Sequence, residues 1–176
     1  MALMNGVCKL CDFNRLYNFR DIMIRKATVR DVKVIYRLLK KHADRGELLP
    51  RALSDLYDDV RDFSVFEEKS GGSIIGVCAL HVCWEDLAEI RSLAVREQYQ
   101  REGIGSALVT AAMAEAQDLG IRRVFTLTYR PDFFNKHGFK IVDKTTLPQK
   151  IWAECVKCVK FPDCDEIAML KQLSEG

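Results

Sequence analysis

Residues 93–106 read Leu-Ala-Val-Arg-Glu-Gln-Tyr-Gln-Arg-Glu-Gly-Ile-Gly-Ser, so that a short apolar segment is followed by a polar loop and a pair of glycines. The periodic apolar residues after Gly103 predict a helix that begins near Ile104. The N-terminus of a helix presents unpaired N–H groups and the positive end of the helix dipole, and glycines let an anion approach the backbone closely. Leu108 stands where a dinucleotide motif has its third glycine, and no Walker A sequence follows. This stretch therefore predicts a phosphate-binding strand, loop and helix, with a simple tight turn as the alternative.

The rest of the chain extends this unit into a mixed α/β arrangement. Hydrophobic spacing and turn residues predict the order β-α-α-β-β-β-α-β-α-β, followed by a tail without predicted structure. The expected strands cover residues 23–27, 63–68, 73–82, 87–95, 123–128 and 139–142. The expected helices follow Thr28, run from about 53 to 62 and from 104 to 119, and begin at Pro131.

Composition and charge narrow the class of protein. The chain has 176 residues, of which 48% are hydrophobic and 30% charged, as expected for one folded domain. A net charge of +2 and the lack of a long basic run argue against nucleic-acid binding, and no apolar run is long enough to span a membrane. The charged residues among the first 25 argue against a secretory signal. We expect residues 1–22 to form a mobile N-terminal extension and residues 23–176 a single domain with a cysteine-rich C-terminal segment.

The seven cysteines indicate a reducing, cytoplasmic environment rather than a disulfide framework. Cys155, Cys158 and Cys164 have the spacing C-x2-C-x5-C, which suits half of a zinc site. A fourth ligand is not evident, although Cys8, Cys11 or a histidine would be of the right type. We predict free thiols here and leave a structural zinc ion as the less favoured alternative. Cys78 and Cys83 are expected to fill core volume.

Three motifs together resemble the GNAT family of N-acetyltransferases over residues 23–142. They are Leu-Ala-Val at 93–95, Gln-Arg-Glu-Gly-Ile-Gly-Ser at 100–106 and Phe-Asn-Lys-His-Gly-Phe at 134–139. The resemblance implies an α/β (α+β) fold with a mixed, mostly antiparallel sheet, helices on both faces and a splayed cleft for acetyl-CoA, the co-substrate. It also implies the residues that contact acetyl-CoA: Leu93, Ala94, Val95, Gln100, Arg101, Glu102, Gly103, Ile104, Gly105, Ser106 and Phe134.

Further segments are similar to amino-acid N-acetyltransferases of the N-acetylglutamate synthase type, most closely the single-domain bacterial form. These segments are 47–51, 88–95, 125–129, 133–134 and 147–152. This narrower resemblance implies acetyl transfer to the α-amine of L-glutamate, or of L-glutamine, as the first step of arginine biosynthesis. The implied partner is a small-molecule substrate, an amino acid. No nucleic-acid or membrane partner is expected, and the sequence leaves open whether the chain forms a homodimer.

The reaction requires a base, because an α-ammonium group must lose a proton before it attacks the thioester. The resemblance places this base at Glu89, acting through water; the alternative is a carboxylate that only pairs with a neighbouring cation. Substrate carboxylates call for Arg or Lys, and Arg51, Arg91 and Lys150 are the candidates. Arg91 faces the same side of its strand as Glu89, so it either binds substrate or neutralises Glu89.

The thiolate leaving group needs a proton donor unless it departs as the anion. Phe134 stands where many relatives have a tyrosine that protonates the thiolate. Tyr129 is a candidate replacement, and the alternative is that the thiolate leaves unprotonated. With no obvious acyl-enzyme nucleophile, we expect direct attack in a ternary complex.

Two other functions stay open as alternatives to amino-acid acetylation. Another amine, such as a polyamine, an antibiotic or a protein amine, is an alternative acceptor. A regulatory module that binds acyl-CoA without turnover is a second alternative. The three histidines, His42, His81 and His137, are expected to carry no chemistry, with His137 partly protonated beside a helix C-terminus.

Overall fold

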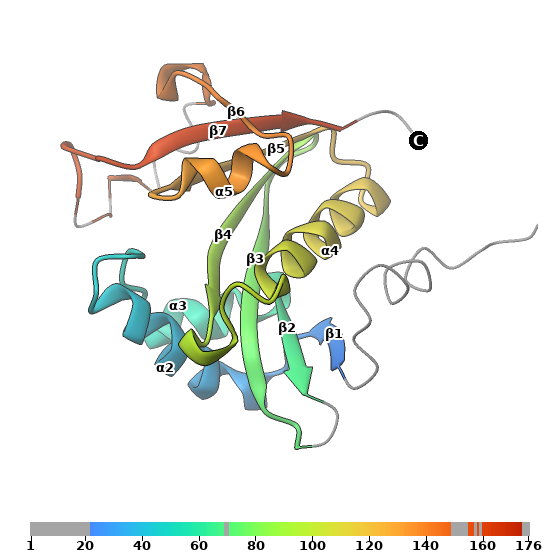
Figure 1. The fold of residues 1–176 in the computed structure, drawn as a ribbon. Coiled ribbons are helices and arrows are strands. Elements are labelled where there is room, and N and C mark those ends of the chain that lie inside the picture. Colours follow the sequence, from blue (N-terminus) through green and yellow to red (C-terminus); the bar gives the residue numbers. More distant parts are fainter. Residues whose placement is uncertain (1–21, 69–70, 149–154, 157, 159, 174–176) are drawn as a thin grey trace, which may run out of the picture.

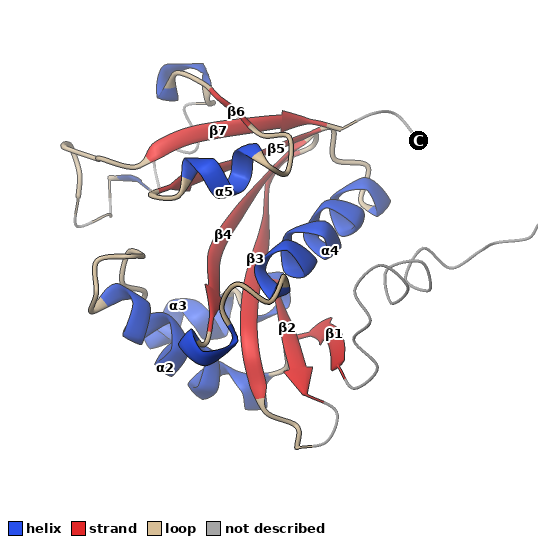
Figure 2. Ribbon diagram, viewed as in Figure 1, coloured by secondary structure: helices blue, strands red, loops and turns tan. Residues whose placement is uncertain are grey.

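The computed structural model describes residues 22–68, 71–148, 155–156, 158 and 160–173. Over these residues the chain forms a seven-stranded sheet with helices on both of its faces (Figures 1 and 2). The strand order is β1-β2-β3-β4-β5-β7-β6, and only β4 and β5 are parallel neighbours. The strands are β1 (Ile22–Lys26), β2 (Phe63–Glu68), β3 (Ile74–Trp84), β4 (Leu87–Val95), β5 (Arg123–Thr128), β6 (Lys140–Ile141) and β7 (Ile167–Gln172). The expected mixed, mostly antiparallel sheet is thus confirmed.

Among the described residues, four α-helices accompany this sheet. They are α2 (Val32–Ala43), α3 (Leu53–Asp58), α4 (Ile104–Asp118) and α5 (Pro131–Asn135), with 3-10 turns at Val29–Asp31, Val60–Asp62, Glu97–Tyr99 and Lys144–Thr146. Helices α2 and α3 share one hydrophobic cluster with β2 and β3, and α4 shares another with residues of β2, β3, β4 and β5. Burial of these apolar faces from both sides is what fixes the sheet between the helices.

The 3-10 turn at Val29–Asp31, which leads into α2, is capped by Thr28 and Asp31. The Thr28 backbone N–H donates to the Asp31 carboxylate at 2.8 Å, and Arg25 donates to the same carboxylate at 2.7 Å. These bonds lower the pKa of Asp31 to about 2, chiefly through Arg25. Arg25 also contacts Glu67, so the capped turn is connected to β1 and β2.

The C-terminal part of the sequence departs from the prediction. The tail contains β7, which lies between β5 and β6 and pairs with β5 over Arg123–Thr128. Both faces of β7 are partly covered, so its sequence lacks the alternation of apolar and polar residues by which a half-exposed strand is predicted. The helix expected over 53–62 is also shorter, because it ends at Asp58 and a 3-10 turn follows.

The feature that shapes the cleft is the short pairing of β4 with β5. Their parallel ladder joins Leu87 with Arg123, Ala88 with Val124 and Glu89 with Phe125, and it ends there. The rest of β4 continues along β3, whereas β5 continues along β7. The two strands therefore diverge beyond Glu89, as Figure 1 shows, and the expected splay is confirmed.

A bulge in β4 lies at the point of divergence. Val77 of β3 is opposite Ala94 and Ala79 is opposite Arg91, so Cys78 alone faces two residues of β4, Ser92 and Leu93. Ser92 has a φ of 55°, a conformation in which an extra residue is commonly accommodated in a strand. The bulge bends the last residues of β4 relative to its first part.

In the part of the chain that the structure describes, no helix is long and apolar enough to cross a membrane. The predicted extension lies outside the described residues, apart from Ile22, which already belongs to β1. The boundary at residue 22 stays a prediction.

Gly76 provides a test of how α4 sits on the sheet. A Cβ at this position of β3 would lie 3.0 Å from both Ile104 Cγ2 and Leu108 Cδ1. A Gly76→Val change should therefore displace the first turn of α4 and lower the free energy of unfolding by about 1–3 kcal/mol. Urea denaturation measures this change, and a variant as stable as the wild type would contradict the described packing.

Candidate active site

A cavity of about 470 Å³ opens where β4 diverges from β5. Its walls come from the loop before α3, from α3 itself, from β4 and from the segment before β7. The lining includes three of the sequence-predicted residues, Arg51, Glu89 and Arg91. The strand order thus brings together residues that are up to 40 positions apart in the sequence and that carry opposite charges.

Asp59 connects the two arginines of this cavity. Arg91 Nη2 donates to Asp59 Oδ2 at 2.8 Å, and Arg51 Nη2 donates to the same oxygen. Arg91 Nη1 also lies 3.9 Å from Glu89 Oε2. All four side chains are mostly buried, with between 14% and 23% of each exposed, so water screens these contacts only partly. We did not predict a role for Asp59 from the sequence, where the only signal is the run of acidic residues around α3.

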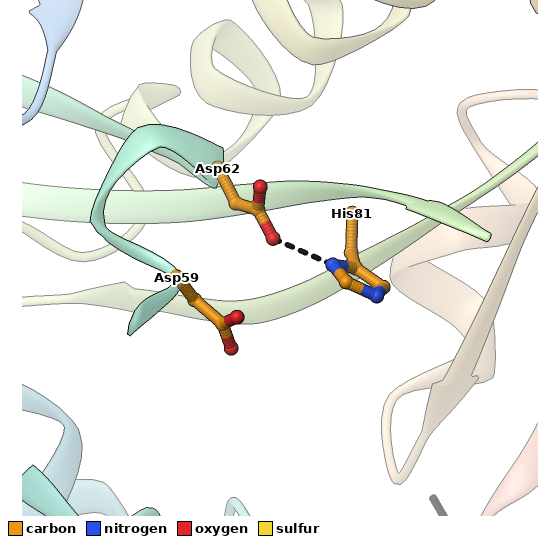
Figure 3. A group of neighbouring side chains, drawn as sticks. All are labelled: Asp59, Asp62 and His81. Carbon is orange, nitrogen blue, oxygen red and sulfur yellow. Dashed lines mark hydrogen bonds and ion pairs between the residues drawn. The ribbon is translucent and has the colours of Figure 1, made fainter. Parts of the chain in front are cut away.

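Asp62 and His81 lie beside Asp59 and extend this network, as Figure 3 shows. His81 Nδ1 and Asp62 Oδ2 are 2.6 Å apart, and Arg91 Nη2 lies 3.6 Å from the same oxygen. Ligand atoms of Asp59, Asp62 and His81 all lie within 4.8 Å of one another, a spacing that would suit a metal ion. The guanidinium groups of Arg51 and Arg91 already supply positive charge at this cluster. It is therefore an ion-pair network that holds both arginines.

A second carboxylate, Glu166, faces the cavity together with Glu89. Burial, and secondarily the negative charge of Glu89, raise the pKa of Glu166 to about 7. Glu166 immediately precedes β7, and it was missed because β7 itself was not predicted. Among its carboxylates the cavity therefore holds Glu89, which lies near Arg91, and Glu166, which has a pKa of about 7.

Tyr129 is not among the described residues that line the cavity; its hydroxyl donates to Asp165 Oδ1 at 2.9 Å. Burial and this hydrogen bond raise the pKa of Tyr129, so the phenol stays protonated. Lys150 lies outside the described residues.

The three clustered cysteines line the same cavity as free thiols. Among the described residues, only Asp59, Asp62 and His81 bring three metal-ligand atoms together, so the sulfur atoms of Cys155, Cys158 and Cys164 do not converge on one point. Burial raises the pKa of Cys155, which favours the thiol over the thiolate. Cys8 and Cys11 lie outside the described residues, and the zinc alternative stays untested. Cys78 is buried in the core cluster as expected.

The predicted phosphate loop lies at the far end of β4. Gly103 precedes α4 with a φ of 86°, and Arg101 also has a positive φ of 67°. Gln100 Nε2 donates to the Val95 carbonyl at 3.2 Å, which closes the loop onto the strand. Gly105 lies in the first turn of α4, where a Cβ would lie 3.5 Å from the Phe133 ring. The loop therefore brings exposed backbone N–H groups to the end of the splay, as a diphosphate requires.

Helix α5 supports this loop from the side. His137 Nε2 and Ser106 Oγ are 3.1 Å apart, which connects the residues after α5 with the first turn of α4. Burial and the charge of Lys171 lower the pKa of His137, so the expected partial protonation is wrong at neutral pH. Phe134 is buried and packs edge-to-face against Phe133 and Phe139.

The residues of β4, the loop and α4 fit acetyl-CoA. Residues 90–95 of β4 have no ladder partner on their β5 side, so that edge can pair with an extended amide-containing arm. The helix N-terminus with its two glycines follows directly. Of the residues implied by the resemblance, Leu93, Ala94 and Val95 lie on this strand, and Gln100 to Ser106 form the loop and first turn.

The raised pKa of Glu166 generates a prediction about stability. A carboxyl whose pKa is about 4.5 when unfolded and about 7 when folded favours the unfolded state as pH rises between these values. A Glu166→Gln variant should therefore melt at a higher temperature than the wild type at pH 8, by a few degrees, and at the same temperature near pH 4.

Asp165→Asn is the matched control for this measurement. Lys160 and Tyr129 lower the pKa of Asp165, so this change should not raise the melting temperature at pH 8. Equal melting temperatures of Glu166→Gln and wild type at pH 8 would contradict the described environment of Glu166.

The comparisons with known proteins agree with this geometry. The acetyltransferase (GNAT) family model matches residues 32–139. The chain is 41% identical to an uncharacterized N-acetyltransferase of Chlorobaculum tepidum, over 87% of this chain and 97% of that one. It is 38% identical to an amino-acid acetyltransferase of Mycobacterium tuberculosis, over 75% of this chain and 76% of that one.

A solved structure extends the similarity to three dimensions. N-acetylglutamate synthase from Neisseria gonorrhoeae, complexed with coenzyme A and N-acetyl-glutamate, superimposes with a TM-score of 0.79 at 26% identity. The match covers 87% of this chain and 35% of that one. The fold, the splayed strands, the glycine loop and the family match together show that the chain belongs to the GNAT family of acetyltransferases, with acetyl-CoA as co-substrate.

Proposed function

We propose that the chain transfers the acetyl group of acetyl-CoA to the α-amine of an amino acid, L-glutamate or L-glutamine, as the first step of arginine biosynthesis. The observation that carries this proposal is that Arg51, Arg91 and Glu89 line one cavity at the splay. The relatives named as amino-acid acetyltransferase and N-acetylglutamate synthase support it. A cytoplasmic location and a homodimer stay predictions.

The two arginines suit a substrate carboxylate. Guanidinium groups bind carboxylates through paired, charge-assisted hydrogen bonds, and Arg51 and Arg91 already share such an acceptor in Asp59. Asp59 therefore orients both groups, and an α-carboxylate would use their remaining N–H donors. In this role Asp59 is a positioning residue, because it acts through the arginines.

The α-ammonium group of the substrate needs a base, and Glu89 is our candidate. It lies on β4 where the strand leaves β5, with its Oε2 atom 3.9 Å from Arg91 Nη1. Glu166 raises the alternative that the two carboxylates act as a pair, since its pKa of about 7 is suited to proton exchange at neutral pH. In either case the proton leaves through a carboxylate in the cavity wall.

The strand itself supplies the electrophilic assistance. When bound, acetyl-CoA brings an activated thioester carbonyl, and a backbone N–H within Leu93 to Val95 would donate to its oxygen from the open edge of β4. Because Tyr129 does not line the cavity, the coenzyme A thiolate is expected to leave without a proton from that phenol. Direct attack of the amine on the thioester completes the reaction.

A second candidate acceptor is favoured by the charge balance of the cavity. Its described lining contains five carboxylates, on Asp55, Asp58, Asp59, Glu89 and Glu166, and three cations, on Arg51, Arg91 and Lys144. The two arginines are already paired with Asp59, and Lys144 donates to the Cys164 carbonyl at 2.7 Å. This excess of negative charge favours a cationic amine such as a polyamine.

Thiol release distinguishes these functions. We expect free coenzyme A to appear from acetyl-CoA with glutamate or glutamine, but not with the other standard amino acids or with spermidine. Arg91→Ala should raise the KM for the amino acid about tenfold or more, because a charge-assisted contact is lost. Lys33→Gln, on the exposed side of α2, is the control. Release with spermidine alone would favour the second candidate. If no amine leads to release of coenzyme A, the result would favour a binding module.

The role of Glu89 is tested separately. Glu89→Gln keeps the shape of the side chain but cannot accept the ammonium proton, so kcat should fall about 10²–10⁴-fold. The KM for acetyl-CoA should change little, because Glu89 lies at the start of β4 and the loop at its end. Unchanged turnover in this variant would remove Glu89 as the base and point to Glu166.

A further inference from the structure

His42 of α2 is buried and contacts two functional segments. Its Nε2 atom lies 3.0 Å from the carbonyl oxygen of Val95, and its Nδ1 atom lies 2.6 Å from Glu47 Oε2. Only 10% of its side chain is exposed. The expectation that this histidine carries no role does not account for two short contacts at opposite ends of one ring.

These partners define the protonation state of the ring. A backbone carbonyl and an ionised carboxylate only accept hydrogen bonds, whereas a neutral imidazole has a single N–H donor. Two donated bonds therefore require the imidazolium, with Glu47 as its counter-ion. Glu97 also interacts electrostatically with His42, and Glu97 is in turn paired with Arg45 at 2.7 Å and lies near Lys41 of α2.

The two partners of His42 belong to the two halves of the site. Val95 ends β4, and its carbonyl also accepts the hydrogen bond from Gln100 of the phosphate loop. Glu47 begins the segment 47–51, which we call the cavity loop, because Leu48, Leu49, Pro50 and Arg51 all line the cavity. One imidazolium thus connects the strand end at the acetyl-CoA side with the loop that carries Arg51.

We propose that His42 is a positioning residue that, as an imidazolium, holds the cavity loop against the end of β4. The functional part of this proposal rests on the proposed function, in which the amino acid occupies the cavity. Loss of the ring proton leaves one donor for two acceptors, so one of the two contacts must be given up. The loop then moves more freely, and amino-acid binding weakens while acetyl-CoA binding changes less.

A matched pair of variants separates this role from simple packing. Glu47→Gln presents an amide N–H to Nδ1, so a neutral ring with its proton on Nε2 keeps both contacts. Glu47→Ala removes the Nδ1 contact in either protonation state. The first variant should therefore keep the wild-type KM for the amino acid, whereas the second should raise it about tenfold.

The direct measurement is ¹⁵N NMR of the His42 ring in the protein without substrate. We expect both ring nitrogens to be protonated in the wild type at pH 7, and only Nε2 in Glu47→Gln. Amide hydrogen exchange of residues 44–51 should be about tenfold faster in His42→Ala than in wild type or Lys33→Gln. A neutral His42 ring in the wild type, or unchanged exchange in His42→Ala, would overturn the proposal.

The ring spectrum and the amide hydrogen exchange do not depend on turnover. If His42→Ala does not fold, the ring spectrum of the wild type and the pair of Glu47 variants still decide the question. A charged ring and a slow-exchanging loop in a protein that acetylates no amino acid would contradict the proposed function and leave the contact between loop and strand intact. Equal amino-acid KM values in Glu47→Gln and Glu47→Ala would contradict the positioning role itself.

Discussion

The parallel ladder between β4 and β5 ends at Glu89 and Phe125, and the arrangement of the site depends on this interruption. Two constraints produce it: β5 is fully paired with β7 on its other side, and β4 contains a bulge at Ser92 that bends the strand. An unpaired strand edge inside a sheet is costly unless another chain or a ligand satisfies it. The open edge of β4 is therefore a site built for an extended partner with amide groups.

The second determinant is a balance of charge beside this opening. Asp59 holds Arg51 and Arg91, Glu89 lies beside Arg91, and burial near Glu89 raises the pKa of Glu166 to about 7. The described lining carries five carboxylates and three cations, so negative charge is in excess. The ammonium group of a bound amino acid would offset part of this excess, and its carboxylate would need the two arginines.

Local signals made much of the fold predictable. The glycine loop, the first residue of α4 and the bounds of β2, β4 and β5 follow from short-range periodicity and turn residues, and the structure confirms them. Strand β7 was missed because a short apolar segment covered on both faces has no alternation to reveal it.

The site likewise contains residues with a local sequence signal and residues without one. Glu89, Arg91 and Arg51 were predicted because they belong to recognisable segments, and all three line the cavity. Asp59, Glu166 and His42 were not, because their importance arises from partners 32 to 77 residues away that only the tertiary fold brings near. A buried histidine between two acceptors has no signature in the sequence.

Amide hydrogen exchange with and without acetyl-CoA tests the central claim most directly. If the open edge of β4 and the start of α4 hold the co-substrate, saturating acetyl-CoA should slow exchange about tenfold or more at amides within residues 92–95 and 103–106, and leave β1 and β2 nearly unchanged. Protection spread evenly over the sheet, or none at residues 92–106, would contradict the account.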